Sequence, residues 1–397
     1  MAKGLWQPPS LRLEKEGGEK QKATWLELFY DLIFVVAIAQ LAHNLSAHVS
    51  LEGFAGFVAL FFPVWWCWIN AIFYATRFDT DDLIDRLLTL LQMAIIASLA
   101  VNVHHGLSSS SIGFALAYAA SQTVLIVQYI VAGYHVEEAR LVSRWFTIGY
   151  GISVLLWVAS VFIPIPWRFT LWTLAIIFDL ATPLTSGKLL ANLPLSTHHV
   201  PERFGLFTII VLGESAASVV RAVREEHWHL SSVIVAIWCL LIAFSIWWIY
   251  FDNLEGSMVQ EKIQKQPYAL VAWVYSHFPL VVGITATGVG VEKVILGLAK
   301  TETILPPGER WLFCGSIALC LIFIAIIHWI SCYIGKKGKK NKVLSYYHLG
   351  SAAFILILAV AGNSLSALLL TTLVTVACVA QVVVDLTYNK SIANLDL

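Results

Sequence analysis

The feature that most constrains this sequence is a series of apolar stretches, each close to the roughly 20 residues that a helix needs to cross a bilayer. Only 13% of the 397 residues are charged, about half the usual share in soluble domains, and the mean hydropathy is +0.76. The sequence therefore predicts an all-α polytopic membrane protein. Twelve transmembrane helices are expected, at 25–47, 53–76, 83–104, 111–134, 144–164, 167–187, 203–222, 231–251, 267–289, 310–333, 346–363 and 366–388. Ambiguous boundaries at two prolines and at a short Gly-Asn-Ser turn leave ten or eleven helices as alternatives.

Composition and missing motifs exclude several classes of function. Lys plus Arg and Asp plus Glu number 25 each, so no net charge favours a nucleic-acid partner, and the lipid bilayer is the expected partner. The sequence has no phosphate-binding loop, dinucleotide fingerprint or nucleophile elbow, which argues against ATP-driven transport, a bound cofactor and the common hydrolase mechanism. The six cysteines contain no C-x-x-C pair and are interpreted as packing residues. Whether the chain forms a homo-oligomer is left open.

The distribution of basic residues predicts the orientation of the helices. When the first turn of each flanking helix is counted with its loop, nineteen Lys and Arg lie in the two tails and the alternate loops beginning with 77–86. The other loops hold six. Because cytosolic loops are enriched in Lys and Arg, a multi-pass protein of the cell membrane with both termini in the cytosol is expected.

Similar segments open the first and seventh predicted helices and indicate an internal repeat. They begin at Glu27 and at Glu202. A second tryptophan pair, Trp247-Trp248, corresponds to Trp65-Trp66. A six-helix unit repeated once has both copies entering the membrane from the same side, which predicts two parallel six-helix repeats. The expected organisation is a cytosolic tail at 1–24, repeats at 25–187 and 202–388, a linking loop at 188–201, and a cytosolic tail at 389–397.

Two blocks of sequence resemble a known family. They are WLELFYDLIFV at 25–35 and HHVPERFGLFTIIVLGES at 198–215. Both resemble the bacterial low-temperature-requirement A (LtrA) family, which is named for a cold-growth phenotype, and similar length and hydropathy extend the resemblance over most of the chain. A weaker likeness links Phe29, Asp31, Phe34 and their neighbours to the Phe-Ser-Asp motif that opens each six-helix repeat of endolysosomal and bacterial potassium channels. Tyr30 replaces the serine, and Leu206 stands where the second repeat would carry the aspartate.

Ionisable residues inside membrane helices are costly and usually face a bundle interior or a water-filled cavity, so they point to function. At 100° per residue, Glu27, Asp31, Phe34 and Ile38 share one stripe of the first helix. The stripe is interpreted as a cation vestibule followed by a hydrophobic constriction. In the alternative interpretation, the acids only stabilise the helix dipole and the apolar residues only pack.

Further candidates lie elsewhere in the chain. On the seventh helix Glu214 is expected within about 40° of Arg203 and Arg221, where it either exchanges a proton or cation or pairs with an arginine. Glu202 is expected to take the place of Glu27 in the second repeat. Asp179 and Asp385 are either part of an ion pathway or members of structural pairs and helix caps. The whole set of expected pathway residues is Glu27, Asp31, Phe34, Ile38, Asp179, Glu202, Arg203, Glu214 and Asp385.

Two other groups of side chains have simpler interpretations. Six histidines, at 43, 48, 104, 105, 227 and 229, fall near the outer face and would form a pH sensor or metal site, but no H-E-x-x-H spacing is present and no metal site is expected. The acidic run Asp79, Asp81, Asp82 and Asp85 is interpreted as a cap of the third helix.

The predicted repeat and the buried acids favour transport over other functions. The chain is expected to be a channel or an ion-gradient-driven transporter for a small cation or a proton-coupled solute, with Asp31 and Glu214 as the groups that change occupancy. An intramembrane acid/base enzyme acting on a lipid-like or hydrophobic substrate is one alternative. A non-catalytic accessory membrane protein for cold or stress adaptation is another.

The topology can be tested with reporter fusions after residues 340 and 390. Two helices are predicted between these points, so both reporters should be active in the cytosol. Reporters on opposite sides would require an odd number of spans between them and would contradict the twelve-helix arrangement.

Overall fold

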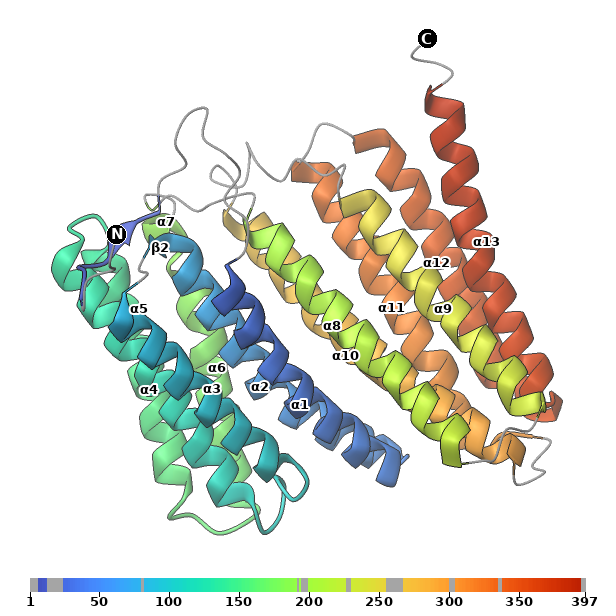
Figure 1. Ribbon diagram of the computed structural model, residues 1–397, viewed down its shortest axis with the longest axis horizontal. Helices are drawn as coiled ribbons and strands as arrows, with labels where there is room; N and C mark the ends of the chain where they lie inside the picture. Colours follow the sequence, from blue (N-terminus) through green and yellow to red (C-terminus); the bar gives the residue numbers. More distant parts are fainter. Residues whose placement is uncertain are drawn as a thin grey trace. The chain divides into compact units, whose positions relative to one another are not determined.

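The described part of the chain is almost entirely helical, which confirms the all-α prediction. The computed structural model describes residues 6–12, 24–79, 82–190, 193, 199–225, 230–254, 267–299, 304–334 and 338–393. Its long helices are α1 (Trp25–Ala47), α2 (Leu51–Arg77), α3 (Leu83–Val103), α4 (Ser111–His135), α5 (Arg140–Ser160), α6 (Trp167–Thr185), α8 (His199–Glu225), α9 (Leu230–Leu254), α10 (Pro267–Ala299), α11 (Pro307–Ile334), α12 (Gly338–Ala361) and α13 (Ala367–Ala393) (Figure 1). A short helix α7 (Gly187–Leu190) and a 3-10 turn (Gly362–Ser364) complete the helical elements of these residues.

Eleven helices within the described ranges are long and apolar enough to cross a membrane. The twelfth long helix, α6, is not among them, because Arg168 and Asp179 lower its mean hydropathy. Helices α10 and α12 exceed their predicted bounds by the most. Helix α10 continues past 289 to Ala299, and Glu292 in this extension accepts a hydrogen bond from the Ser46 hydroxyl (2.6 Å). Helix α12 begins at Gly338 rather than at 346.

Part of the predicted N-terminal tail is an ordered element of the fold. Strand β1 (Ser10–Leu11) pairs antiparallel with β2 (Phe78–Asp79), with Ser10 opposite Asp79. Leu11 packs against the apolar cluster that contains Phe78, which explains why this otherwise polar segment docks. Asp82 accepts hydrogen bonds from the backbone of Gln7 (2.6 Å) and of Asp85 (2.7 Å). The second bond caps α3 and confirms the cap interpretation, whereas Asp81 lies outside the described residues.

The chain divides into two compact units. Unit 1 comprises Met1–Leu41, Val58–Phe204 and Gln260–Val271, and unit 2 comprises Ala42–Phe57, Gly205–Val259 and Ala272–Leu397. In unit 1, α3, α4, α5 and α6 pack in sequence order, each against the next. Aromatic rings fill the space between them: Tyr118 lies 4.6 Å from Trp157, and Trp157 lies 4.6 Å from Trp172, between ring centroids.

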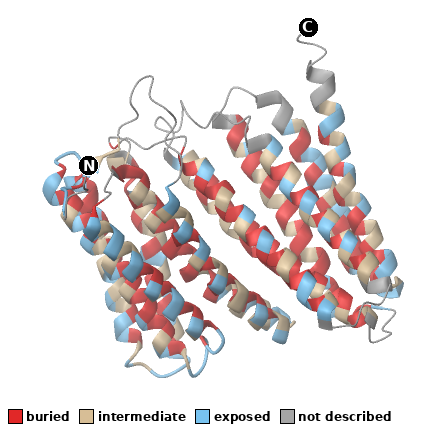
Figure 2. Cartoon of the chain, in the orientation of Figure 1, coloured by how far each residue is buried: buried red, intermediate tan, exposed pale blue. Residues whose placement is uncertain are grey.

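In unit 2, α11 packs against α12, and α9 packs against α13. Helix α10 is buried over most of its length (Figure 2). Its glycines allow neighbouring backbones to approach closely, as small residues do in membrane helices. A Cβ added at Gly290 would lie 2.8 Å from Phe313 Cα, and one at Gly283 would lie 2.8 Å from Cys320 Sγ.

We expect Gly290→Ala to lower the free energy of unfolding by about 1–3 kcal/mol, because the added methyl group meets the α11 backbone, which cannot rotate away. Gly350→Ala is the matched control, since a Cβ there meets nothing within 4 Å. Unfolding of both variants is measured in lipid nanodiscs. Equal stability of the two variants would contradict the close contact between α10 and α11.

Candidate functional site

The first helix begins with a capping box that fixes the position of an acidic side chain. The Glu27 backbone N–H donates to the Thr24 hydroxyl (3.2 Å), and the Thr24 backbone N–H donates to the Glu27 carboxylate (2.9 Å). This reciprocal pair satisfies two backbone donors that a helix start leaves open. Glu27 is therefore held at the start of α1, where both of its carboxylate oxygens meet further partners.

One helical turn further, Asp31 is completely buried and is held from two other helices. Its Oδ1 accepts a hydrogen bond from Trp68 Nε1 of α2 (2.9 Å) and one from Arg203 Nη2 of α8 (2.6 Å). The Trp68 ring also contacts Phe204 edge-on at 5.1 Å between centroids. Asp31 Oδ2 has no hydrogen-bond partner among the described residues. These contacts join the starts of α1 and α8 to the middle of α2.

Arg203 links both acids, and more distant groups complete the cluster. Its Nη1 lies 3.2 Å from Glu27 Oε2, while its side chain is only 3% exposed. Arg12 lies 3.5 Å from the other Glu27 oxygen, and His199 Nε2 lies 3.4 Å from Glu27. We call Glu27, Asp31, Arg203, Arg12 and His199 the acid–arginine cluster. Its two carboxylates balance its two guanidinium groups, so a proton on His199 would give it a net positive charge.

The pairing has a clear physical cause. Moving a lone ion from water into a membrane interior costs several kcal/mol, and only a close counter-ion with good hydrogen bonds offsets most of that cost. Arg203 has two carboxylates within 3.2 Å, which meets this requirement. His199 is 1% exposed, and neither ring nitrogen has a hydrogen-bond partner within the described ranges. It also lies 3.9 Å from Glu202.

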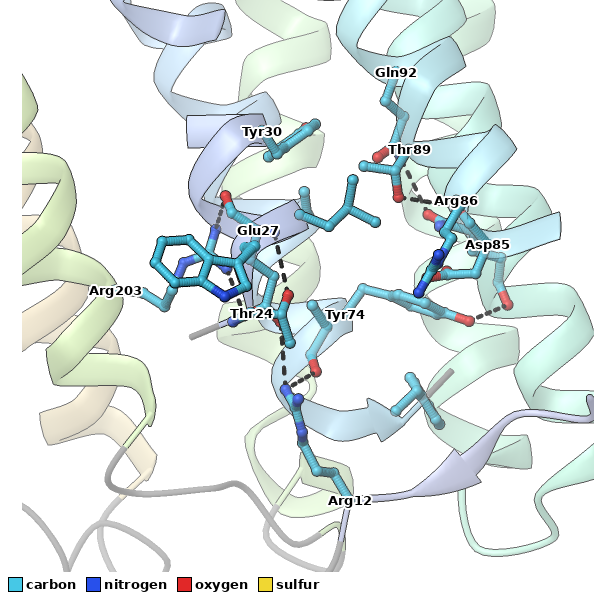
Figure 3. A pocket seen from close by; sticks show the side chains of 16 residues that line it. Arg12, Thr24, Glu27, Tyr30, Tyr74, Asp85, Arg86, Thr89, Gln92 and Arg203 are labelled. Carbon is cyan, nitrogen blue, oxygen red and sulfur yellow. Dashed lines mark hydrogen bonds and ion pairs between the residues drawn. The ribbon is translucent and has the colours of Figure 1, made fainter. Parts of the chain in front are cut away.

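A cavity of about 340 Å³ opens beside this cluster in unit 1. Figure 3 shows Glu27, Thr24 and Arg203 on one side of it and Asp85, Arg86 and Thr89 on the other. Gln92 and Gln128 also line it and are joined by a hydrogen bond (3.1 Å). The volume is at the lower end of the roughly 300–1,000 Å³ of small-molecule sites, and the convergent polar groups are typical of such sites.

Buried polar side chains continue from the cavity along α2 and α4. Six residues before Gln128, about 9 Å along the helix axis, Gln122 accepts a hydrogen bond from Asn70 (3.1 Å). Gln122 in turn donates to the Tyr118 hydroxyl (2.7 Å), and Tyr118 donates to Asp179 (2.6 Å). These residues are uncharged apart from Asp179, which is fully buried in α6.

The structure brings some of the predicted pathway residues together and separates others. Glu27, Asp31 and Arg203 meet in the acid–arginine cluster, and Phe34 and Ile38 are fully buried beyond them on α1. Arg203 pairs with these acids rather than with Glu214 of its own helix. Glu214 and Asp385 belong to unit 2.

In unit 2, Glu214 forms an ion pair with Arg221 (2.7 Å), whose side chain is 52% exposed. Asp385 is buried in α13, one turn after Gln381. No set of three or more His, Cys, Asp or Glu side chains suited to a metal ion is found in the described part of the chain. His227 and His229 lie outside the described residues.

Sequence reasoning did not select Trp68, His199 or Arg12 as site residues. Trp68 is an uncharged residue within an apolar stretch, and Arg12 lies in the predicted N-terminal tail. His199 had a usable signal, because His199, Glu202 and Arg203 fall on adjacent turns at the start of a helix, within one of the two family-like blocks.

The profile of the bacterial low temperature requirement A protein (LtrA) family matches residues 22–386. The chain belongs to the LtrA family. A curated relative of the chain, an uncharacterized protein of Rhizobium meliloti (strain 1021), is 27% identical over 376 residues, which cover 90% of this chain and 88% of the relative. The predicted LtrA resemblance is thus confirmed, and the matched region contains Glu27, Asp31 and Arg203 of the acid–arginine cluster.

In this LtrA chain, Arg203→Gln should lower the free energy of unfolding by about 3–5 kcal/mol, because it leaves the buried Asp31 without a counter-ion. Adding Asp31→Asn should recover part of that loss, since the unpaired charge is then removed as well. Arg140→Gln, at the exposed pair with Glu137 (3.8 Å), is the control and should have no measurable effect. Additive losses in the double variant would show that Asp31 and Arg203 do not interact.

Proposed function

We propose that this LtrA protein transports a proton-coupled, small polar solute across the membrane, and that the solute enters through the cavity beside the acid–arginine cluster. The observation that carries the proposal is the cavity itself. It lies among membrane helices, and its wall contains Arg203, whose two carboxylate partners are buried or nearly so. Ionisable groups that face a cavity within membrane helices usually mark a solute or ion pathway.

The charges around the cavity favour a solute over a bare cation. Three guanidinium groups, from Arg12, Arg86 and Arg203, line it together with two carboxylates, from Glu27 and Asp85. Asp31, which is bound to Arg203, brings the carboxylates to three, so a bare cation would meet no excess of negative charge, whereas a polar solute with an anionic group would meet donors of fixed geometry. Such a group would compete with Glu27 and Asp31 for Arg203, so solute binding and release of the ion pair would be coupled.

Proton coupling fits the composition of the cluster. His199 faces Glu27 of α1 and Glu202 of α8, with Arg203 and Arg12 also bound to Glu27. If the anionic group of a solute binds Arg203 in place of Glu27, Glu27 loses a positive counter-charge. A proton on His199, which also faces Glu27, would replace that counter-charge. Beyond the cluster, the side chains of Phe34 and Ile38 on α1 are fully buried. This apolar packing fits a gate that stays closed until the ion pair separates.

The proposal predicts flux into proteoliposomes that requires Asp31 and Arg203. Wild-type protein is assayed against a panel of amino acids, carboxylates, amines and alkali cations, with and without a pH gradient. Asp31→Asn keeps the volume but removes the charge, so it should reduce proton-coupled flux by at least about tenfold, the equivalent of 1.4 kcal/mol of lost interaction.

Glu137→Gln is the matched control, because it removes an exposed carboxylate from an ion pair outside the cavity, and its flux should equal that of wild type. Membrane insertion and folding of each variant are checked by size-exclusion chromatography. Absence of wild-type flux for every solute, or normal flux in Asp31→Asn, would overturn the proposal and favour an enzyme or accessory role.

A further inference from the structure

Four consecutive hydrogen bonds in unit 1 all point the same way and end on one carboxylate. Tyr150 donates to Asn70 Oδ1 (2.9 Å), and Asn70 donates to Gln122 Oε1 (3.1 Å). Gln122 donates to the Tyr118 oxygen (2.7 Å), and Tyr118 donates to Asp179 Oδ2 (2.6 Å). Because each donor polarises the next, a chain of uniform direction strengthens the last bond and focuses positive partial charge on Asp179.

The carboxylate at the end of the chain is nevertheless under-compensated. Asp179 is completely buried, and its Oδ1 has no hydrogen-bond partner within the described ranges. No Lys, Arg or His of the described residues forms an ion pair with it. A buried carboxylate with one phenolic donor and no counter-ion among the described residues is costly in an apolar interior, so a further positive charge at Oδ1 would stabilise it.

A proton fits this position better than a metal cation does. Sodium, calcium and similar hard ions require about six oxygen ligands, whereas a proton requires one. The titratable groups facing Asp179 are Tyr118 of α4 and Cys67 of α2, and α5 presents the uncharged Ser153. The Trp157 ring packs on Tyr118 at 4.6 Å and fills space where further ligands would otherwise stand.

We propose that Asp179 is a reversible proton-binding site in the interior of unit 1. The proton comes from water and forms an O–H bond at Oδ1, and on release it returns to water, so no other bond is made or broken. Protonation removes the charge that strengthens the Tyr118 bond, and the change is passed through Gln122 to Asn70.

Asn70 lies on α2, two residues after the Trp68 that donates to Asp31, so α2 connects the proton site to the acid–arginine cluster. Proton binding at Asp179 does not depend on the proposed transport. If transport is also correct, this site supplies a second coupling step, in addition to the His199 step at the cluster.

Infrared difference spectroscopy of the purified protein in nanodiscs tests the proposal without any flux measurement. Lowering the pH from about 9 to about 4 should produce carboxylic-acid C=O bands, and the wild type should show one band that is absent from Asp179→Asn, while the bands of the other carboxyl groups are common to both proteins. Tyr118→Phe keeps the carboxylate but removes its donor, so the same band should remain and shift in frequency. Asp82→Asn, which retains its helix-capping role, should leave the band unchanged.

Identical spectra for wild type and Asp179→Asn would overturn the proposal, because Asp179 would then keep one charge state throughout. If Asp179→Asn does not fold, Tyr118→Phe decides, since a band that fails to shift there does not come from this site. The outcome is independent of transport. A band without flux supports the proton site alone, and flux without a band supports transport alone.

Discussion

The structure of unit 1 depends on how one guanidinium group is accommodated among membrane helices. Arg203 is only 3% exposed, and two carboxylates lie within 3.2 Å of it. Because an unpaired guanidinium would be strongly disfavoured there, the chain must bring Glu27 and Asp31 to the same place, and the capping box at Thr24 and the indole of Trp68 fix these two acids. The residue after β1 (Arg12) and the start of α8 (His199 and Arg203) supply members of the cluster, and the cavity borders it.

The polar interior of unit 1 is built mostly from neutral groups. Asn70, Gln122 and Tyr118 are each buried, and each is both a donor and an acceptor in one directed chain. A neutral amide or phenol costs far less to bury than an ion, provided that its hydrogen bonds are made. The hydrogen-bonded chain can therefore extend polarity deep into the helices with a single charged member, Asp179, at its end.

The helices and part of the site were predictable because both rest on local patterns. Apolar length indicated the spans, and the 100° periodicity placed Glu27, Asp31, Phe34 and Ile38 on one stripe of α1. The pairing of Asp31 with Arg203 was not predictable, since the two residues lie 172 positions apart in the sequence. The geometry of the seventh helix alone placed Arg203 on the same face as Glu214, which pairs with Arg221. Asn70, Gln122 and Tyr118 carry no charge and lie on two predicted helices far apart in sequence, so nothing in one sequence marks them as a connected chain.

The positions that the predicted repeat pairs with Asp31 and Trp68 show how the two halves differ. Leu206 stands in place of Asp31, and Tyr250, two residues after the second tryptophan pair, stands in place of Trp68. Tyr250 contacts His277 Nε2 (3.0 Å), and His277 Nδ1 contacts the Trp273 carbonyl (2.8 Å). Because a carbonyl only accepts, Nδ1 carries the hydrogen and Nε2 accepts from the phenol, which is a neutral pair. Where unit 1 has an aspartate bound by arginine, unit 2 thus has an uncharged hydrogen-bonded pair. A pore formed by two equivalent halves would need acids of similar placement in both. The acid–arginine cluster instead takes Glu27 and Asp31 from the predicted first repeat and Arg203 from the second, so the two predicted halves contribute charges of opposite sign to one site.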